Sequence, residues 1–79
     1  MQKSLSSSKQ KSFLALLRQV REEAALRQID IADRLDQPQS FVSKYESGER
    51  RLDLLELELV CVACDIDLVE FVRRYQAKA

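Results

Sequence analysis

Several residue types and patterns that enzymes and membrane proteins depend on are missing from this chain. Its 79 residues include no histidine, one glycine and one proline, too few for a histidine-based catalytic centre or a glycine-rich phosphate loop. No apolar run approaches the ~20 residues of a membrane span, and the N-terminal lysines precede no apolar segment of a secretory signal. We therefore expect a cytoplasmic protein that is not an enzyme, has no cofactor and has no membrane partner.

Cysteine is also scarce, with Cys61 and Cys64 forming a C-x-x-C inside an apolar run. Half of a zinc site or a redox pair would need histidine, further cysteines or a surrounding βαβ pattern, none of which the sequence supplies. Three residues apart on a helix, the two are more simply small core residues. We expect no metal.

The chain has no net charge, which at first argues against a nucleic-acid partner, because phosphate neutralisation supplies much of such affinity. The charges are unevenly distributed, however. Residues 1–51 hold ten Lys/Arg against seven Asp/Glu, whereas residues 52–79 hold three against six. A basic half and an acidic half suit a protein with one surface for DNA and another for something else.

Apolar residues recur at three- and four-residue intervals, as in the stripe from Phe13 to Val20, which predicts amphipathic helices. Pro38 suits a first helical turn, and the only glycine, Gly48, suits the end of the same helix. Residues 1–11 are polar and lysine-bearing, so we expect a disordered basic tail. The predicted single domain, 12–79, contains helices at about 12–25, 28–35, 38–46, 53–64 and 67–77.

The stretch after Leu52 reads L-D-L-L-E-L-E-L and alternates with the period of a strand. A helix is favoured, because no second strand-like run exists to pair with it and Asp53 can cap twelve residues free of Gly and Pro. One face of that helix then has apolar residues to spare: Leu55, Leu59 and Val62. The pattern as a whole predicts an all-α, five-helix bundle.

The stretch from Gln28 to Glu46 reads as two short helices joined by a tight corner at Asp36-Gln37. The outer face of the second helix carries hydrogen-bonding side chains with little reason to be buried. Such side chains can read base edges in a DNA major groove, so we interpret the stretch as a helix-turn-helix. The candidate base-contacting residues are Gln39, Ser40, Ser43 and Lys44.

From Leu17 to Leu68 the chain resembles the phage-repressor type of helix-turn-helix, the Cro/repressor or XRE family. The resemblance is carried by R-E-E at 21–23, Gln28, Ile31-Ala32, Leu35, P-Q-S-F-V-S-K-Y-E at 38–46, Gly48 and E-R-R-L-D at 49–53. It implies a lambda-repressor-like fold and a transcriptional regulator that binds double-stranded DNA.

The resemblance also implies roles for single residues. Gln28 matches a glutamine that contacts phosphate and steadies the first base-reading side chain, here Gln39. Arg21 lies beside the apolar stripe and would need a partner if buried, and it matches an arginine that pairs with Glu46. Residues that match or adjoin backbone-contacting positions are Gln28, Arg27, Ser47, Arg50 and Arg51.

The chain departs from the family pattern at three positions. Asp36 replaces the usual corner glycine, so the left-handed turn depends on a residue that only tolerates it. Phe41 replaces a small polar residue, and the sequence leaves open whether it packs inward or meets a thymine methyl group. Glu49 is acidic in a loop that would face phosphate, which weakens binding.

The expected function is repression as a homodimer on a palindromic operator, with half-sites about 34 Å apart. The alternative is an antitoxin-like or anti-repressor module that binds a protein partner through the C-terminal half. The predicted dimer interface comprises Leu55, Leu59, Val62, Phe71, Val72 and Tyr75. The first three of these residues could instead pack under the last helix within one subunit.

Overall fold

The computed structural model describes residues 8–77 and contains five helices, with no strand in that range. In chain order they are α1 (Ser8–Glu23), α2 (Gln28–Leu35), α3 (Gln39–Ser47), α4 (Leu54–Ala63) and α5 (Leu68–Ala77). The predicted all-α, five-helix architecture is therefore confirmed. None of these helices is long and apolar enough to cross a bilayer.

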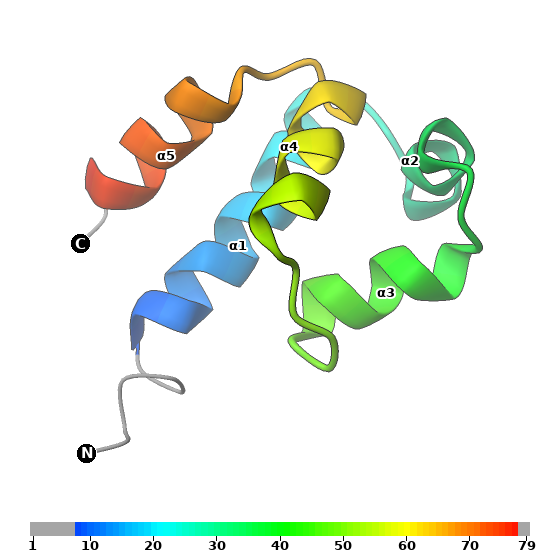
Figure 1. Ribbon diagram of the computed structural model, residues 1–79, viewed down its shortest axis with the longest axis horizontal. Helices are drawn as coiled ribbons and strands as arrows, with labels where there is room; N and C mark the ends of the chain where they lie inside the picture. The colour runs from blue at the N-terminus through cyan, green and yellow to red at the C-terminus, as the bar shows by residue number, and fades with distance from the viewer. Residues whose placement is uncertain (1–7, 78–79) are drawn as a thin grey trace.

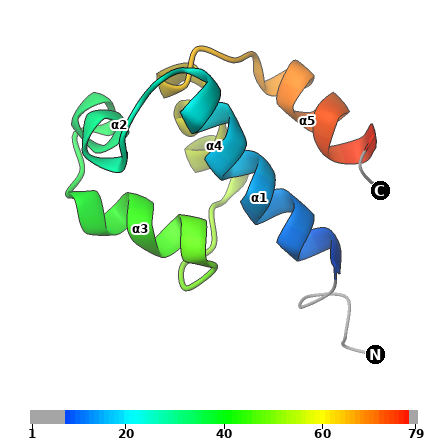
Figure 2. The same ribbon diagram turned by 180° about the vertical axis from the view of Figure 1, so that it is seen from behind.

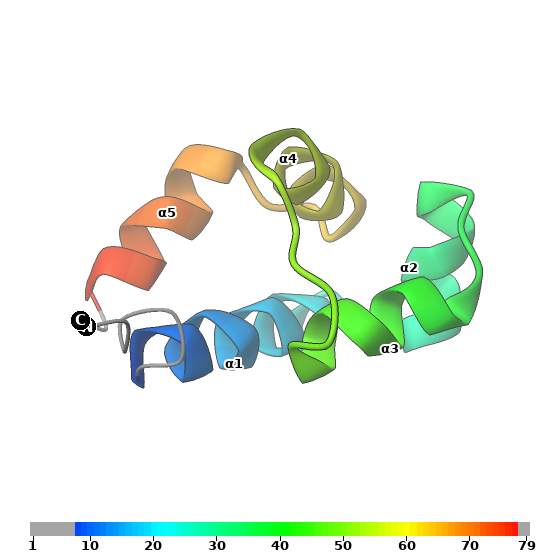
Figure 3. The ribbon, with the colours of Figure 1, turned by 60° about the horizontal axis from the view of Figure 1, so that its bottom comes forward.

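The helices form a bundle with α2 and α3 at one end and α5 at the other (Figure 1). The view from behind shows α1 running along the molecule in front of α4 (Figure 2). In the third view α1 and α3 share the lower layer, and the loop after α3 climbs to α4 in the upper layer (Figure 3). This arrangement leaves the α2–α3 pair at the edge of the molecule.

The first helix begins at Ser8, whereas the sequence reading placed residues 8–11 in a disordered tail and began the helix near residue 12. The extra turn gains a tertiary contact, because the Lys9 ammonium lies 5.4 Å from the centre of the Tyr75 ring. That contact spans most of the sequence, so no local pattern could predict it. Residues 1–7 of the predicted tail lie outside the described residues.

Three helices are followed within two residues by a residue other than glycine with left-handed backbone angles: Ala25 (φ 61°) after α1, Asp36 (φ 56°) after α2 and Asp65 (φ 60°) after α4. After Ala25, the Leu26 N–H donates to the Arg21 carbonyl at 3.1 Å, which satisfies a carbonyl at the helix end. The corner of the motif is thus turned by Asp36, at the steric cost of a left-handed L-residue.

The fourth helix begins after Asp53, whose carboxylate accepts the Glu56 N–H at 2.8 Å, while the Asp53 N–H donates to the Glu56 carboxylate at 3.0 Å. This reciprocal cap favours a helix over the alternative strand. Arg34 on α2 donates to the Ala63 carbonyl at 2.7 Å and so ties α2 to the C-terminal end of α4.

The core is formed by one apolar face from every helix. Phe71 is 1% exposed and meets the Phe13 ring edge-on, with centroids 6.0 Å apart. Its assignment to a dimer interface was therefore wrong, because one apolar stripe on α5 already faces α1 within the chain. The buried apolar residues are Leu16, Leu17, Val20, Ile31, Ala32, Val42, Tyr45, Val60, Cys61, Ala63, Cys64 and Phe71.

Both cysteines belong to this core. Burial raises the pKa of the Cys61 thiol to about 11 and that of Cys64 to about 12. Thiols with such high pKa values hold almost no thiolate at neutral pH, which is the form that binds metals and attacks disulfides. No cluster of three or more potential metal-ligating side chains occurs within residues 8–77.

Candidate nucleic-acid interface

The third helix has two chemically distinct faces. Val42 and Tyr45 are buried, with 0% and 1% exposure, and fix the helix to the core. Pro38 precedes the helix as its N-cap, one residue earlier than the expected first turn, and its carbonyl accepts the Phe41 N–H at 3.0 Å. The opposite face is fully exposed and holds the predicted base-contacting residues: Gln39, Ser40, Ser43 and Lys44.

The structure brings Arg21 and Glu46 together as a buried ion pair. Arg21 Nε donates to Glu46 Oε2 at 2.6 Å, and Nη2 donates to Oε1 at 3.1 Å. A third guanidinium nitrogen, Nη1, donates to the Leu26 carbonyl at 2.9 Å. Only 10% and 6% of the two side chains are exposed. The hydrogen bond with Glu46 raises the pKa of Arg21, so the guanidinium keeps its charge although it is buried.

The Glu46 carboxylate also accepts a hydrogen bond from Gln28 on α2. Gln28 Nε2 donates to Glu46 Oε1 at 3.1 Å, and Gln28 Oε1 accepts from Gln39 Nε2 at 3.4 Å. A chain of hydrogen bonds therefore runs from the buried pair to Gln39 at the exposed start of α3. We call this chain, Arg21–Glu46–Gln28–Gln39, the polar relay.

The loop after α3 starts at Gly48, which has a left-handed φ of 86°. A Cβ atom there would lie 3.0 Å from Leu14 Cδ1 on α1, so glycine is needed for both conformation and space. Ser47 closes the helix by donating from Oγ to the Lys44 carbonyl at 3.0 Å. The loop is therefore held close against α1.

Arg50 is held against α4, with 40% of its side chain still exposed. Its guanidinium donates to the Glu56 carboxylate at 2.7 and 3.2 Å and lies 4.7 Å from the centre of the Phe41 ring. The hydrogen bond with Glu56 raises the pKa of Arg50 and lowers that of Glu56. These bonds form a clamp between the loop and α4, and the expected backbone contact by Arg50 stays a prediction.

Phe41 forms the other half of this clamp, and it packs inward. Its ring meets the Tyr45 ring edge-on, with centroids 5.5 Å apart, beneath the Arg50 guanidinium. Sequence reasoning left the orientation of Phe41 open and missed the part played by Glu56. The only available signal was the pairing of Glu56 with the Asp53 cap, which already placed that carboxylate near the loop.

Four predicted contact residues have cationic or polar groups on the surface near α3. Lys44 and Arg51 are exposed and form no ion pair with another residue of the described part, 8–77. Arg27 is exposed and pairs with Asp30 at 2.9 Å. That pairing lowers the pKa of Asp30 to about 2. The fourth residue, Ser47, is exposed at the C-terminal end of α3.

The predicted dimer residues lie in two different settings. Leu55, Leu59 and Val62 are 72%, 61% and 67% exposed on the outer face of α4, so they do not pack under α5. Val72 is 37% exposed, and Tyr75 is half-buried beside Phe13. Two further residues that were not predicted, Leu54 at 68% and Val69 at 65%, extend the exposed apolar surface.

A five-helix bundle that presents the polar face of its third helix, anchored through the second, defines the helix-turn-helix class of DNA-binding proteins. Residues 17–71 match the helix-turn-helix family HTH_3. A solved structure described as an XRE-family like protein from Pseudomonas syringae pv. tomato str. DC3000 is 35% identical, with a TM-score of 0.88. That match covers 98% of this chain and 94% of the other.

The chain therefore belongs to the XRE-type helix-turn-helix family, whose members are DNA-binding transcriptional regulators. No curated protein matches it.

Proposed function

We propose that this protein is a sequence-specific repressor that inserts α3 into the major groove of double-stranded DNA. The polar relay is the observation that carries the proposal. Hydrogen bonds of 3.1 and 3.4 Å connect Gln39 through Gln28 to the buried ion pair. A surface glutamine with no function would not need such support, whereas a base-reading side chain gains selectivity from having its orientation fixed. The DNA target also implies action in the cytoplasm, without enzymatic chemistry.

Each exposed residue of α3 has a chemically matched role. Gln39 can donate and accept in the bidentate pattern of adenine N6/N7, and Lys44 can donate to guanine O6/N7. Ser40 and Ser43, on the same face, can hydrogen-bond with several bases. These four side chains supply the sequence information.

Backbone contacts would fix the position of α3 without adding specificity. Arg27 and Gln28 lie at the start of α2, and Ser47 and Arg51 lie at and beyond the end of α3. Together they flank the recognition helix on both sides. Arg50 acts indirectly, because its clamp to Glu56 sets the path of the loop that carries Arg51.

The direct test is selection of bound sites from random duplex DNA, followed by Gln39→Ala and Lys44→Ala on the selected site. We expect each variant to lose discrimination at one base position, by about 1–3 kcal/mol. Lys11→Ala, which removes an exposed lysine of α1 outside the motif, is the matched control and should leave the preference unchanged. Uniform weakening across all sequences would mean that these side chains contact phosphates.

A homodimer is the second part of the proposal. The apolar surface on α4 and α5, formed by Leu54, Leu55, Leu59, Val62 and Val69, is more than 60% exposed at each residue. Exposed apolar side chains gathered on two helices that contact each other suit an interaction site in a soluble protein. Two copies joined there by a two-fold axis would present two α3 helices to a palindromic operator.

Leu59→Lys tests the dimer, because it places a charge at the centre of the surface without touching the core. Sedimentation equilibrium should show a dimer for the unchanged protein and a monomer for the variant. Binding to a full operator should weaken strongly, while binding to an isolated half-site should stay the same. A monomer at high micromolar concentration for the unchanged protein would refute this part.

The same apolar surface supports a second candidate, an antitoxin-like or anti-repressor module that binds a protein partner. Salt dependence separates the two functions. If Arg27 and Arg51 of each protomer neutralise about four phosphates per dimer, log Kd should change with log salt with a slope of about 3.6 in magnitude. An apolar protein contact would show almost no such dependence.

A further inference from the structure

A pocket of about 480 Å³ opens between the N-terminal half of α1, the loop after α3 and the inner face of α5. Its lining includes none of the four residues on the exposed face of α3 that would meet DNA. Its volume falls within the ~300–1,000 Å³ typical of small-molecule sites. Its lining residues are Lys9, Gln10, Phe13, Leu14, Tyr45, Gly48, Arg50, Arg51, Leu52, Leu57, Phe71, Val72 and Tyr75.

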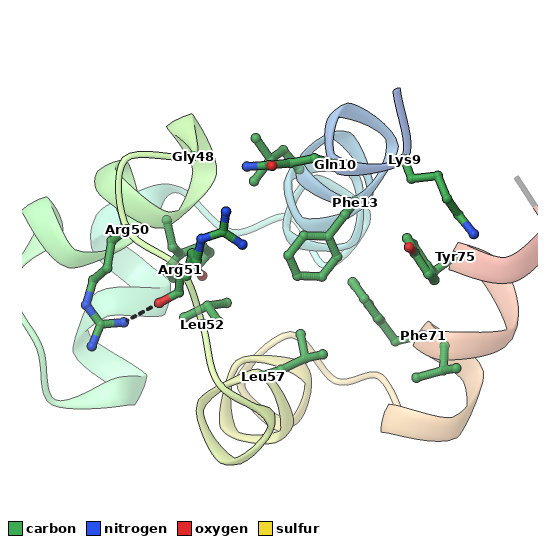
Figure 4. Close-up of a pocket in the computed structure, with 13 residues that line it drawn as sticks. Lys9, Gln10, Phe13, Gly48, Arg50, Arg51, Leu52, Leu57, Phe71 and Tyr75 are labelled. Carbon is green, nitrogen blue, oxygen red and sulfur yellow. Dashed lines mark hydrogen bonds between the residues drawn. The ribbon is translucent and has the colours of Figure 1, made fainter. Parts of the chain in front are cut away.

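The lining has an apolar floor and a rim of one charge sign. Phe13, Leu52 and Leu57 face one another across the interior (Figure 4). The chain as a whole has equal numbers of acidic and basic residues, yet the lining includes three basic side chains and no acidic one. A pocket of this composition favours an apolar molecule that carries a negative charge.

The cations are placed at opposite sides of the opening. The Arg51 guanidinium extends toward Gln10 and Phe13, whereas Lys9 lies on the far side beside Tyr75 (Figure 4). Arg50 turns away from the interior, as its bonds to Glu56 require. Arg51 is therefore the cation best placed to meet an anion in the pocket.

We propose that this pocket binds a small monoanionic amphiphile, an aryl-alkyl or medium-chain carboxylate. Its apolar body lies between Phe13 and Leu57, and its carboxylate pairs with Arg51. The fork of donors on a guanidinium matches a carboxylate in geometry as well as charge. A neutral molecule of the same shape would bury the same apolar surface but leave Arg51 unpaired.

Binding there would act on the DNA-facing loop, and this consequence rests on the proposed function. Gly48 and Arg51 belong both to the pocket wall and to the loop that follows α3. A carboxylate on Arg51 would compete directly with a DNA phosphate for the same guanidinium. The ligand would therefore weaken operator binding, as an inducer does, and DNA would weaken ligand binding by the same factor.

The test uses 4-phenylbutanoate and its neutral amide, 4-phenylbutanamide, as probes of matched size, with the full chain and no DNA. Amide-resolved NMR titration should show shifts confined to the pocket lining, with the carboxylate binding up to about fivefold more tightly than the amide. Arg51→Gln should abolish that difference and leave amide affinity unchanged. Equal binding of the two probes, or shifts centred on Leu55 and Leu59, would overturn the proposal.

A pair of variants on α5 separates pocket filling from general disturbance. Val72 lines the pocket, whereas Gln76 on the same helix is exposed and does not. Val72→Trp should abolish binding of both probes, and Gln76→Trp should leave both affinities unchanged. If the lining resonances move on dilution without any probe, a second copy occupies the pocket and the proposal fails.

A final measurement compares the affinity for the selected DNA duplex with and without each probe. Saturating 4-phenylbutanoate should weaken operator binding about tenfold, while the amide should not. Unchanged operator affinity in the presence of bound carboxylate would overturn the inducer role. If no DNA sequence is ever selected, the proposed function fails, while the NMR titration still decides the pocket.

Discussion

Removing the guanidinium of Arg21 should be the most damaging single truncation of a charged side chain in this fold. Arg21→Ala leaves the Glu46 carboxylate, whose side chain is 6% exposed, with Gln28 as its remaining donor. Breaking a buried ion pair by deleting one partner costs about 3–5 kcal/mol. At about 0.05–0.15 kcal/mol per residue, the whole domain has only about 4–12 kcal/mol of stability. The variant should therefore lose about a quarter of its stability or more.

The assay is urea unfolding at pH 7, followed by circular dichroism at 222 nm. With a slope of about 1 kcal/mol per molar urea for a domain of this size, the midpoint should fall by about 3 M or more. Arg18→Ala is the matched control, because Arg18 pairs with Glu22 on the same helix at 3.0 Å, with 67% and 56% of the two side chains exposed. That exposed pair is worth about 0.2–0.5 kcal/mol.

A double replacement, Arg21→Met with Glu46→Met, separates the fold from the relay. Apolar side chains of similar volume commonly restore or exceed the stability of a buried ion pair, so the double variant should unfold near the unchanged protein. It should nevertheless lose base selectivity, because Gln28 no longer has its acceptor. An Arg21→Ala curve that coincides with the Arg18→Ala control would refute the reasoning.

Three further outcomes are expected. Ala25→Gly should raise the free energy of unfolding by about 0.5–1 kcal/mol in the same urea assay, because Ala25 has a φ of 61° that glycine adopts without strain; no gain would mean that the helix end relaxes. Cys61 and Cys64, with pKa values raised to about 11 and about 12, should react with a thiol-specific disulfide reagent only as fast as the chain unfolds; rapid labelling in native buffer would contradict their burial. Because the pKa of Asp30 falls from 3.8 unfolded to about 2 beside Arg27, its contribution is present above pH 4 and lost as pH falls toward 2; Asp30→Asn should remove that part of the acid sensitivity, and an identical acid profile would contradict it.

Much of the fold follows from patterns that are local in the sequence. The stripe from Phe13 to Val20 predicts the buried face of α1, and Gly48 predicts the end of α3 through its left-handed angle. Asp53 predicts the start of α4, because its carboxylate can reach the N–H three residues ahead. Each of these signals spans fewer than ten residues, the range over which helix periodicity and capping operate.

The features that the sequence concealed depend on contacts between distant residues. Lys9 joins α1 because Tyr75, on the last helix, lies beside it. Arg50 is held against α4 by Glu56 and lies over the Phe41 ring. The apolar stripe that includes Phe71 showed that α5 has a buried face, but a stripe cannot distinguish a partner helix in the same chain from one in a second copy.

The polar relay gives a physical reason for keeping charge inside a small core. An apolar pair at positions 21 and 46 would serve stability as well or better, but it would offer nothing to Gln28. The Glu46 carboxylate accepts two hydrogen bonds from Arg21 and still accepts a third from Gln28, since an ionised carboxylate has about four acceptor sites. Arg21 is held in turn by the Leu26 carbonyl at the end of α1. The orientation of Gln39 is therefore set by the core rather than by α3 alone, and under the proposed function the same carboxylate links the stability of the domain to its reading of DNA.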